Sequence, residues 1–215
     1  MEAVSEIPAL HSSPGRLGAP GLGAGPDSPG NATGIASSVL AVAIFIGSEI
    51  MLFGGLLSGF IILRAGNPFW PPPGQPRLPL LVTTLNTAVL FVSAWTVLRA
   101  LRAVRRGDSQ GLTSALVATL ALGLTFLAVQ GSEWMRLIRY GLTAGSSVYG
   151  GVFYTLVGLH ALHVAAAVTA LAAVLGLARA GRYSRTSHGG VAALSMYWCF
   201  VVALWGVIYV VVYLG

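Results

Sequence analysis

Five long apolar stretches decide what this chain can fold into. They run over residues 35–63, 80–103, 113–137, 148–178 and 191–214, and short segments rich in polar residues, Gly or Pro separate them. A helix needs about 20 apolar residues to cross the hydrocarbon core of a bilayer. Backbone groups find no water there, so each stretch must be helical, and the stretches are too long and uniform for barrel strands. We therefore predict an all-α, polytopic membrane bundle of five transmembrane helices.

Composition supports lipid as the solvent. Charged residues make up 8% of the chain and hydrophobic residues 55%, whereas a soluble domain carries roughly 25% charged residues. All twelve basic residues are arginines that lie at the ends of the apolar stretches and form no single patch. They indicate membrane flanks, and they argue against a nucleic-acid partner. The one cysteine, Cys199, lies inside an apolar stretch, which excludes a disulfide framework.

The first 34 residues are rich in Gly and Pro and poor in aliphatic side chains. We predict a flexible, disordered tail over 1–34 and one membrane domain over 35–215. Five spans place the two termini on opposite sides of the membrane. Eight arginines fall on the side of the N-terminus and four on the other side. The positive-inside rule then predicts a cytoplasmic N-terminus and an external C-terminus.

Two carboxyl groups lie within the predicted spans. Glu49 is near the middle of the first span, where an ionisable side chain costs about 2.5–3.5 kcal/mol on insertion scales. Proton handling is one interpretation, and a neutral carboxyl that serves the bundle or a subunit contact is the other. Glu133 precedes Arg136 by three residues in the third span. An intrahelical pair explains Glu133 adequately, although a pair across the bundle is also possible.

His160 and His163 stand three residues apart in the fourth span. Two imidazoles in a membrane invite a haem or metal interpretation, yet no other predicted span contains His. Zinc takes three or four convergent ligands, and a di-iron site takes Glu-x-x-His pairs on two helices. We therefore expect no metal and no bound cofactor on this chain. Hydrogen bonds from both imidazoles to neighbouring helices are the default expectation.

Catalytic motifs are missing from the sequence: it contains no Walker, GxSxG or HExxH pattern. We expect no catalytic residue. The basic loop after the fourth span offers candidates for lipid head-group binding, namely Arg179, Arg182 and Arg185. An independent transporter is disfavoured, because five spans do not divide into two matching halves. A membrane cytochrome would show a haem absorption band, which we do not expect.

Seven sequence blocks, taken in order over roughly residues 40 to 215, resemble subunit III of cytochrome c oxidase. They are Ser48-Glu49-Ile50-Met51-Leu52-Phe53, Trp70-Pro71-Pro72, Leu85-Asn86-Thr87, Gln130-Gly131-Ser132-Glu133-Trp134, Ser147-Val148-Tyr149-Gly150-Gly151, Gly158-Leu159-His160-Ala161-Leu162-His163-Val164, and Tyr197-Trp198 with a closing Tyr213-Leu214-Gly215. The full-length form of the family has seven helices, and this chain matches the last five, as shortened bacterial versions do.

The resemblance implies a non-redox subunit of a haem–copper oxygen reductase in a bacterial cytoplasmic membrane. Haem and copper are then expected in the partner subunit I, on which this subunit packs beside subunit II. The family binds phospholipids in a cleft, supports proton uptake into subunit I and protects it during turnover. Glu49 matches the buried helix carboxylate of the family, and Glu133, His160 and His163 match its other intramembrane polar positions.

The last span departs from the family pattern. Where the family usually has Tyr-Trp-His-Phe-Val-Asp, this chain has Cys199 and Val202 in place of the His and the Asp. Accessory subunits of quinol oxidases, nitric oxide reductases or other respiratory supercomplexes are therefore alternatives.

Overall fold

A computed structural model describes residues 29–70, 72 and 80–214, with the side chains of 29–36 left aside. Over this part the chain is helical throughout, with no strand, and five of its helices are long and apolar enough to cross a membrane. The elements are α1 (Pro29–Ala65), α2 (Leu80–Arg106), α3 (Ser109–Arg139), α4 (Val148–Arg179), α5 (Gly189–Tyr209) and the π-helical turn η1 (Val210–Leu214). The predicted all-α membrane bundle is thereby confirmed.

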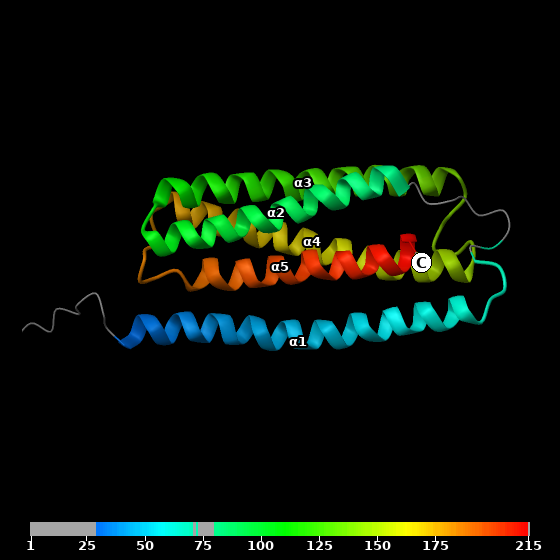
Figure 1. Cartoon of the computed structure of the whole chain (residues 1–215), viewed down its shortest axis with the longest axis horizontal. Coiled ribbons are helices and arrows are strands. Elements are labelled where there is room, and N and C mark those ends of the chain that lie inside the picture. The colour runs from blue at the N-terminus through cyan, green and yellow to red at the C-terminus, as the bar shows by residue number, and fades with distance from the viewer. Residues whose placement is uncertain (1–28, 71, 73–79, 215) are drawn as a thin grey trace, which may run out of the picture.

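The helices lie roughly along one axis and alternate in direction (Figure 1). α2 and α3 form a closely packed antiparallel hairpin, α4 and α5 lie next to it, and α1 runs alone along the opposite side. The buried fraction of each helix reflects this arrangement. Half of the most apolar window of α5 is buried within the chain, but only 11% of the corresponding window of α1. α5 is thus the centre of the bundle, and α1 is its peripheral member.

The helices extend beyond the predicted apolar stretches. α1 begins at Pro29, six residues before the predicted start of the first span and inside the stretch predicted as tail. Proline suits a first helical position, because its missing N–H would have no intrahelical partner there. The remainder of the predicted tail, residues 1–28, lies outside the described residues. α2 continues to Arg106 and α3 to Arg139, since long arginine side chains carry their charge to water beyond the apolar stretch.

Local signals at the helix ends shape two of the described connections. α2 ends at Gly107, whose φ of 78° lets the backbone reverse, and the N–H of Asp108 then donates to the Ala103 carbonyl at 3.0 Å. The Asp108 carboxylate accepts from the N–H of Gly111 at 2.7 Å and so caps the start of α3. Ser147 caps α4 in the same way through Gly150. These local signals set the tight α2–α3 hairpin.

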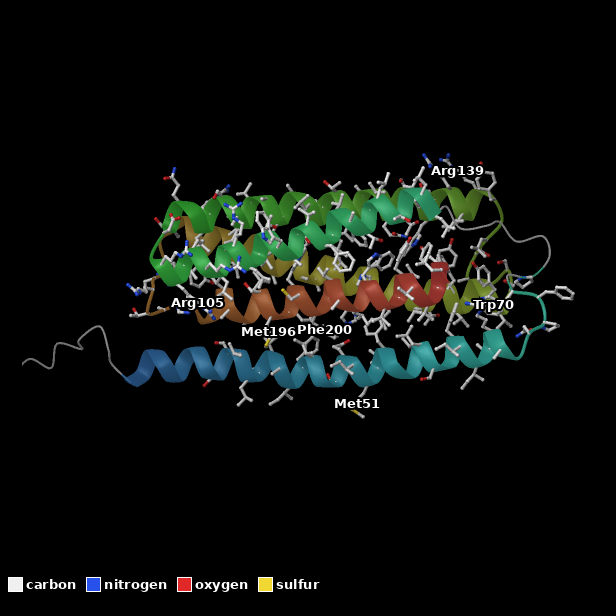
Figure 2. The ribbon with its side chains drawn as sticks, viewed as in Figure 1. Met51, Trp70, Arg105, Arg139, Met196 and Phe200 are labelled. Carbon is white, nitrogen blue, oxygen red and sulfur yellow. The ribbon has the colours of Figure 1, made fainter. Side chains whose placement is uncertain are left out.

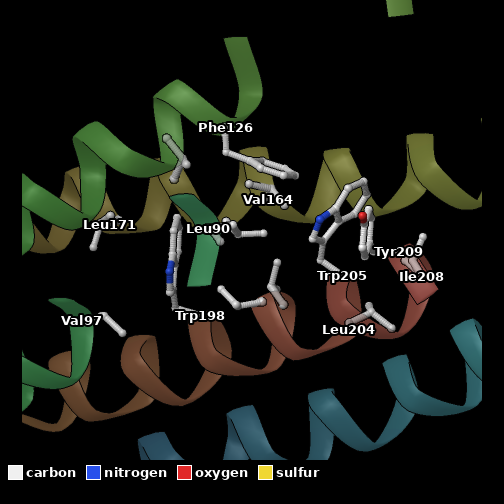
Figure 3. Close-up of a cluster of buried hydrophobic side chains, with 14 of the residues drawn as sticks. Leu90, Val97, Phe126, Val164, Leu171, Trp198, Leu204, Trp205, Ile208 and Tyr209 are labelled. Atoms are coloured by element: carbon white, nitrogen blue, oxygen red, sulfur yellow. The ribbon is translucent and has the colours of Figure 1, made fainter. Parts of the chain in front are cut away.

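Two tryptophans of α5 occupy the core and make hydrogen bonds to α2 (Figure 3). Trp198 donates its indole N–H to the Ser93 hydroxyl at 3.0 Å, and Trp205 donates to the Thr87 hydroxyl at 2.9 Å. All four side chains are buried. In lipid an unpaired indole N–H would be costly, so small hydroxyl residues on α2 and bulky aromatics on α5 fix the register of the two helices.

Gly123 of α3 lies where a methyl group has no room. A Cβ at this position would come within 2.6 Å of Cη2 of Trp198 and 3.2 Å of a Val168 methyl. We expect Gly123→Ala to destabilise the bundle by about 1–3 kcal/mol, the usual cost of overpacking a core. Thermal unfolding of the purified chain in detergent measures the change. Gly131→Ala, on the same helix with open space around it, is the matched control, and an equal Tm for both variants would contradict the close packing.

Candidate functional site: a carboxyl–imidazole pair between α1 and α4

α1 contacts the rest of the chain through few side chains. Among its described residues only Glu49, Phe53 and Phe60 are buried. The other side of the helix is open: Met51 is 80% exposed and points away from the bundle (Figure 2). A polar group is therefore one of the three side chains that α1 buries in this chain.

Glu49 meets His163 of α4. Its Oε2 lies 2.7 Å from Nε2 of His163, and both side chains are almost entirely shielded. The approach has the distance of an ion pair, but its angle lies outside that of a well-aligned hydrogen bond. Phe53, one turn after Glu49, covers the imidazole edge-on at 5.2 Å between ring centroids. The structure thus joins two candidate residues that are 114 positions apart in the chain.

The proton content of this pair follows from the partners of His163. Its Nδ1 lies 2.7 Å from the Leu159 carbonyl oxygen, which only accepts, so Nδ1 carries a proton. One further proton, on either Nε2 or the Glu49 carboxyl, would relieve the repulsion of two lone pairs at 2.7 Å. Whether that proton sits on oxygen or on nitrogen, the pair has no net charge. This neutrality makes a carboxyl tolerable at bilayer depth.

His160 has a different role from His163. It is fully buried, stacks on Trp205 with ring centroids 5.0 Å apart, and meets Phe126 edge-on at 6.4 Å. Neither ring nitrogen has a hydrogen-bond partner. The expected interhelical hydrogen bond is wrong for His160, because aromatic rings surround it on α3 and α5. The two imidazoles of α4 serve different neighbours and do not converge on one ligand.

Glu133 forms the intrahelical pair that its spacing predicts. A guanidinium nitrogen of Arg136 donates to Oε1 of Glu133 at 2.9 Å. The carboxyl is buried, whereas the arginine side chain is 64% exposed. The pair therefore connects a shielded carboxyl to the polar end of α3, and its exposed side limits its contribution to stability.

The other candidate residues stay apart from this pair. Arg179 ends α4, and Arg182 and Arg185 follow in the loop to α5; all three are exposed. In α5, Val202 is buried in the core and Cys199 is a half-buried free thiol. Apolar packing thus occupies the place where the resembling family has an Asp. Over the described residues, no three His, Cys, Asp or Glu side chains gather closely enough to hold a metal ion.

Sequence reasoning missed a set of uncharged polar contacts between α2 and its neighbours. Asn86 is buried and donates from its amide to the Phe126 carbonyl at 3.1 Å. The hydroxyls of Thr96 and Thr119 lie 2.8 Å apart between α2 and α3. An Asn inside an apolar stretch is itself a signal, because such groups usually face a partner helix. Thr and Ser give no such signal, since they also bond their own helix, as Thr87 and Ser93 do here.

Comparison with known proteins gives the family. A family model described as "Cytochrome c oxidase subunit III" matches residues 30–215. The chain belongs to the cytochrome c oxidase subunit III family. It is 38% identical to the cytochrome c oxidase subunit 3 of Synechocystis sp., over 82% of this chain and 75% of that protein. It is 33% identical to the subunit 3 of Thermostichus vulcanus, over 82% of this chain and 86% of that protein.

A third relative is named as a probable cytochrome c oxidase subunit 3, from Nocardia farcinica. It is 34% identical over 79% of this chain and 84% of its own length. The resemblance inferred from the seven blocks is thus confirmed, and the terms membrane, transmembrane helix, oxidase and respiratory chain apply to this subunit III. Membership of the family is consistent with a chain that holds no cofactor.

The Glu49–His163 pair generates a stability prediction for this subunit III. Glu49→Leu removes one partner and leaves a buried imidazole nitrogen unsatisfied, at a cost of about 1–3 kcal/mol. Adding His163→Phe removes the second polar group, so we expect the double variant to recover most of that loss. Thermal unfolding in detergent measures both, and Met51→Leu on the exposed side is the control. Additive losses in the double variant would show that the two side chains are not coupled.

Proposed function

We propose that this chain is the non-redox subunit III of a haem–copper terminal oxidase. In this assignment it packs on subunit I beside subunit II, and the haem and copper belong to the partner subunit. The observation that carries the proposal is the buried Glu49–His163 contact, which lies within a chain that matches the family over residues 30–215. The names of the relatives as subunits of an oxidase support membership of such a complex.

Support for proton uptake is the role that we assign to the Glu49–His163 pair. The pair brings a carboxyl oxygen and an imidazole nitrogen within 2.7 Å of each other in a shielded place at the α1–α4 contact. Transfer of a proton between the two groups leaves the net charge of the pair unchanged, which suits a residue that buffers a neighbouring pathway. Glu133 is the less favoured site, because its exposed arginine partner fixes it as a charged pair.

Phospholipid binding is supported by the groove between α1 and α4. This α1–α4 groove has a volume of about 560 Å³ and a mostly apolar lining that includes Gly55 and Gly59 of α1 and Gly151 of α4. Small side chains on both helices keep it open, and acyl chains match its apolar walls.

We assign Arg179, Arg182 and Arg185 to lipid head groups at the end of α4.

The orientation of the chain in the membrane follows from its arginines. Arg105 and Arg139 lie at opposite ends of the molecule (Figure 2), and the end with Arg105 carries the larger share of positive charge. We place that end and the N-terminus in the cytoplasm, and the C-terminus outside a bacterial cytoplasmic membrane.

Affinity purification of the chain in mild detergent tests the assignment. We expect chains with haem and copper to co-purify, and the spectrum and metal content of the complex then identify the oxidase. A quinol oxidase or a nitric oxide reductase would differ in copper content. Recovery of the chain alone, under conditions that keep other membrane complexes intact, would refute the proposal.

Within that complex, Glu49→Gln tests the role of the shared proton. The glutamine amide keeps the size of the carboxyl and donates to Nε2 of His163, so assembly should be intact. We expect a turnover change well below the roughly 100-fold that loss of a direct acid–base catalyst costs. Oxygen consumption by the purified complex measures it, with Ser48→Ala as the neighbouring control. Complete loss of turnover in an assembled complex would contradict a non-catalytic role.

The arginine cluster after α4 is tested for lipid retention. Replacing Arg179, Arg182 and Arg185 together with Gln removes about 1 kcal/mol of attraction to anionic head groups per arginine. We expect less phospholipid on the purified complex by native mass spectrometry, with unchanged haem spectra. Unchanged lipid content would show that these three side chains do not hold lipid.

A further inference from the structure

A basic groove runs along the outside of the α2–α3 hairpin. It has a volume of about 390 Å³ and is lined by residues of both helices; the hairpin itself lies across the bundle from α1 (Figure 1). One wall is a stripe of α2 that carries Trp95, Arg99, Arg102 and Arg106. Their spacings of three and four residues place these four side chains on one face of the helix.

The groove is hollow because α3 presents small residues to this stripe. The facing wall carries Gly111, Ser114, Ala115 and Ala118, which share one face of α3 because 111 and 115, and 114 and 118, are four residues apart. None of them has a side chain long enough to fill the space between the helices. The sequences of both helices therefore determine the groove, because long basic side chains on α2 face short side chains on α3.

The groove carries a net positive charge. Three of its lining residues are arginines, and no carboxylate among the described residues forms an ion pair with them. The one acidic lining residue, Asp108, uses its carboxylate to cap α3. Arg99 is held in place by Trp95, with its guanidinium carbon 4.8 Å from the indole centroid. An anion with several oxygens fits such a set of donors.

The position of the groove relative to the membrane surface indicates a lipid as its ligand. α2 has 27 residues, about 40 Å at 1.5 Å per residue, against a hydrocarbon core of about 30 Å. Arg99 to Arg106 form its last two turns, which fall in the head-group region. Towards the membrane centre the same side continues with exposed apolar residues, Trp95 at 54% and Val92 at 50% exposure. Acyl chains pack there while a phosphate sits among the arginines.

We propose that the basic groove is a binding site for one anionic phospholipid, with its head-group phosphate held by Arg99, Arg102 and Arg106. The site is separate from the α1–α4 groove and from the arginines after α4. It requires only that the chain spans a membrane, so it stands or falls independently of the oxidase assignment.

Titration of phosphatidylglycerol onto the full chain in neutral detergent, followed by native mass spectrometry, tests the proposal. An arginine near the membrane surface contributes about fivefold in affinity for anionic lipid. We expect Arg102→Gln to weaken the tightest binding step about fivefold. Arg105→Gln is the matched control, because it removes the same charge from the same turn of α2 without lining the groove.

A second variant fills the groove without changing charge. Ser114 is exposed and lines the groove, so Ser114→Leu should exclude the lipid while the Tm of the lipid-free chain stays unchanged. Equal weakening by Arg102→Gln and Arg105→Gln would reduce the effect to general surface charge and overturn the proposal. Two other results would also overturn it. One is full displacement of the lipid by inorganic phosphate at equal concentration. The other is that these variants, in the complex, lose partner chains while their lipid binding is unchanged.

Discussion

Lipid gives apolar helices no reason to prefer each other over acyl chains, so the arrangement of this bundle depends on the groups that lipid cannot satisfy. The indole N–H groups of Trp198 and Trp205 find hydroxyls on α2, and the Asn86 amide finds a carbonyl on α3. Each contact joins two helices at one register. Close packing then follows, as at Gly123 against Trp198.

The position of α1 also depends on polar groups that lipid cannot satisfy, but α1 makes few such contacts. Among the described side chains that it buries, one is polar, Glu49, and two are aromatic, Phe53 and Phe60. Most of its surface is left for lipid or for another subunit, and Phe60 in its C-terminal half packs against Trp70 of the following loop. The peripheral place of α1 and the neutral Glu49–His163 pair belong together: the pair fixes the helix and leaves its opposite side available.

The architecture was predictable from the sequence because hydrocarbon thickness sets the length of an apolar helix. The five spans, the Glu133–Arg136 pair and the family follow from length, spacing and sequence blocks. The start of α1 at Pro29 does not follow from these signals, because a helix that extends beyond the membrane needs no apolar residues there. The partner of Glu49 and the stacking of His160 on Trp205 could not be predicted from the sequence either. Both depend on how α4 is rotated between α1 and α5, which sequence spacing leaves open.

The distance along the chain between Glu49 and His163 has a consequence for biogenesis. Ribosomes add roughly 5–20 residues per second, so the 114 residues between the two side chains take on the order of 10 s to synthesise. During that interval α1 has been made but the imidazole that will meet its carboxyl has not. Until then the Glu49 carboxyl has to be accommodated without His163. Docking of α1 is a late step of assembly, because the two helices that it contacts, α4 and above all α5, are the last to be made.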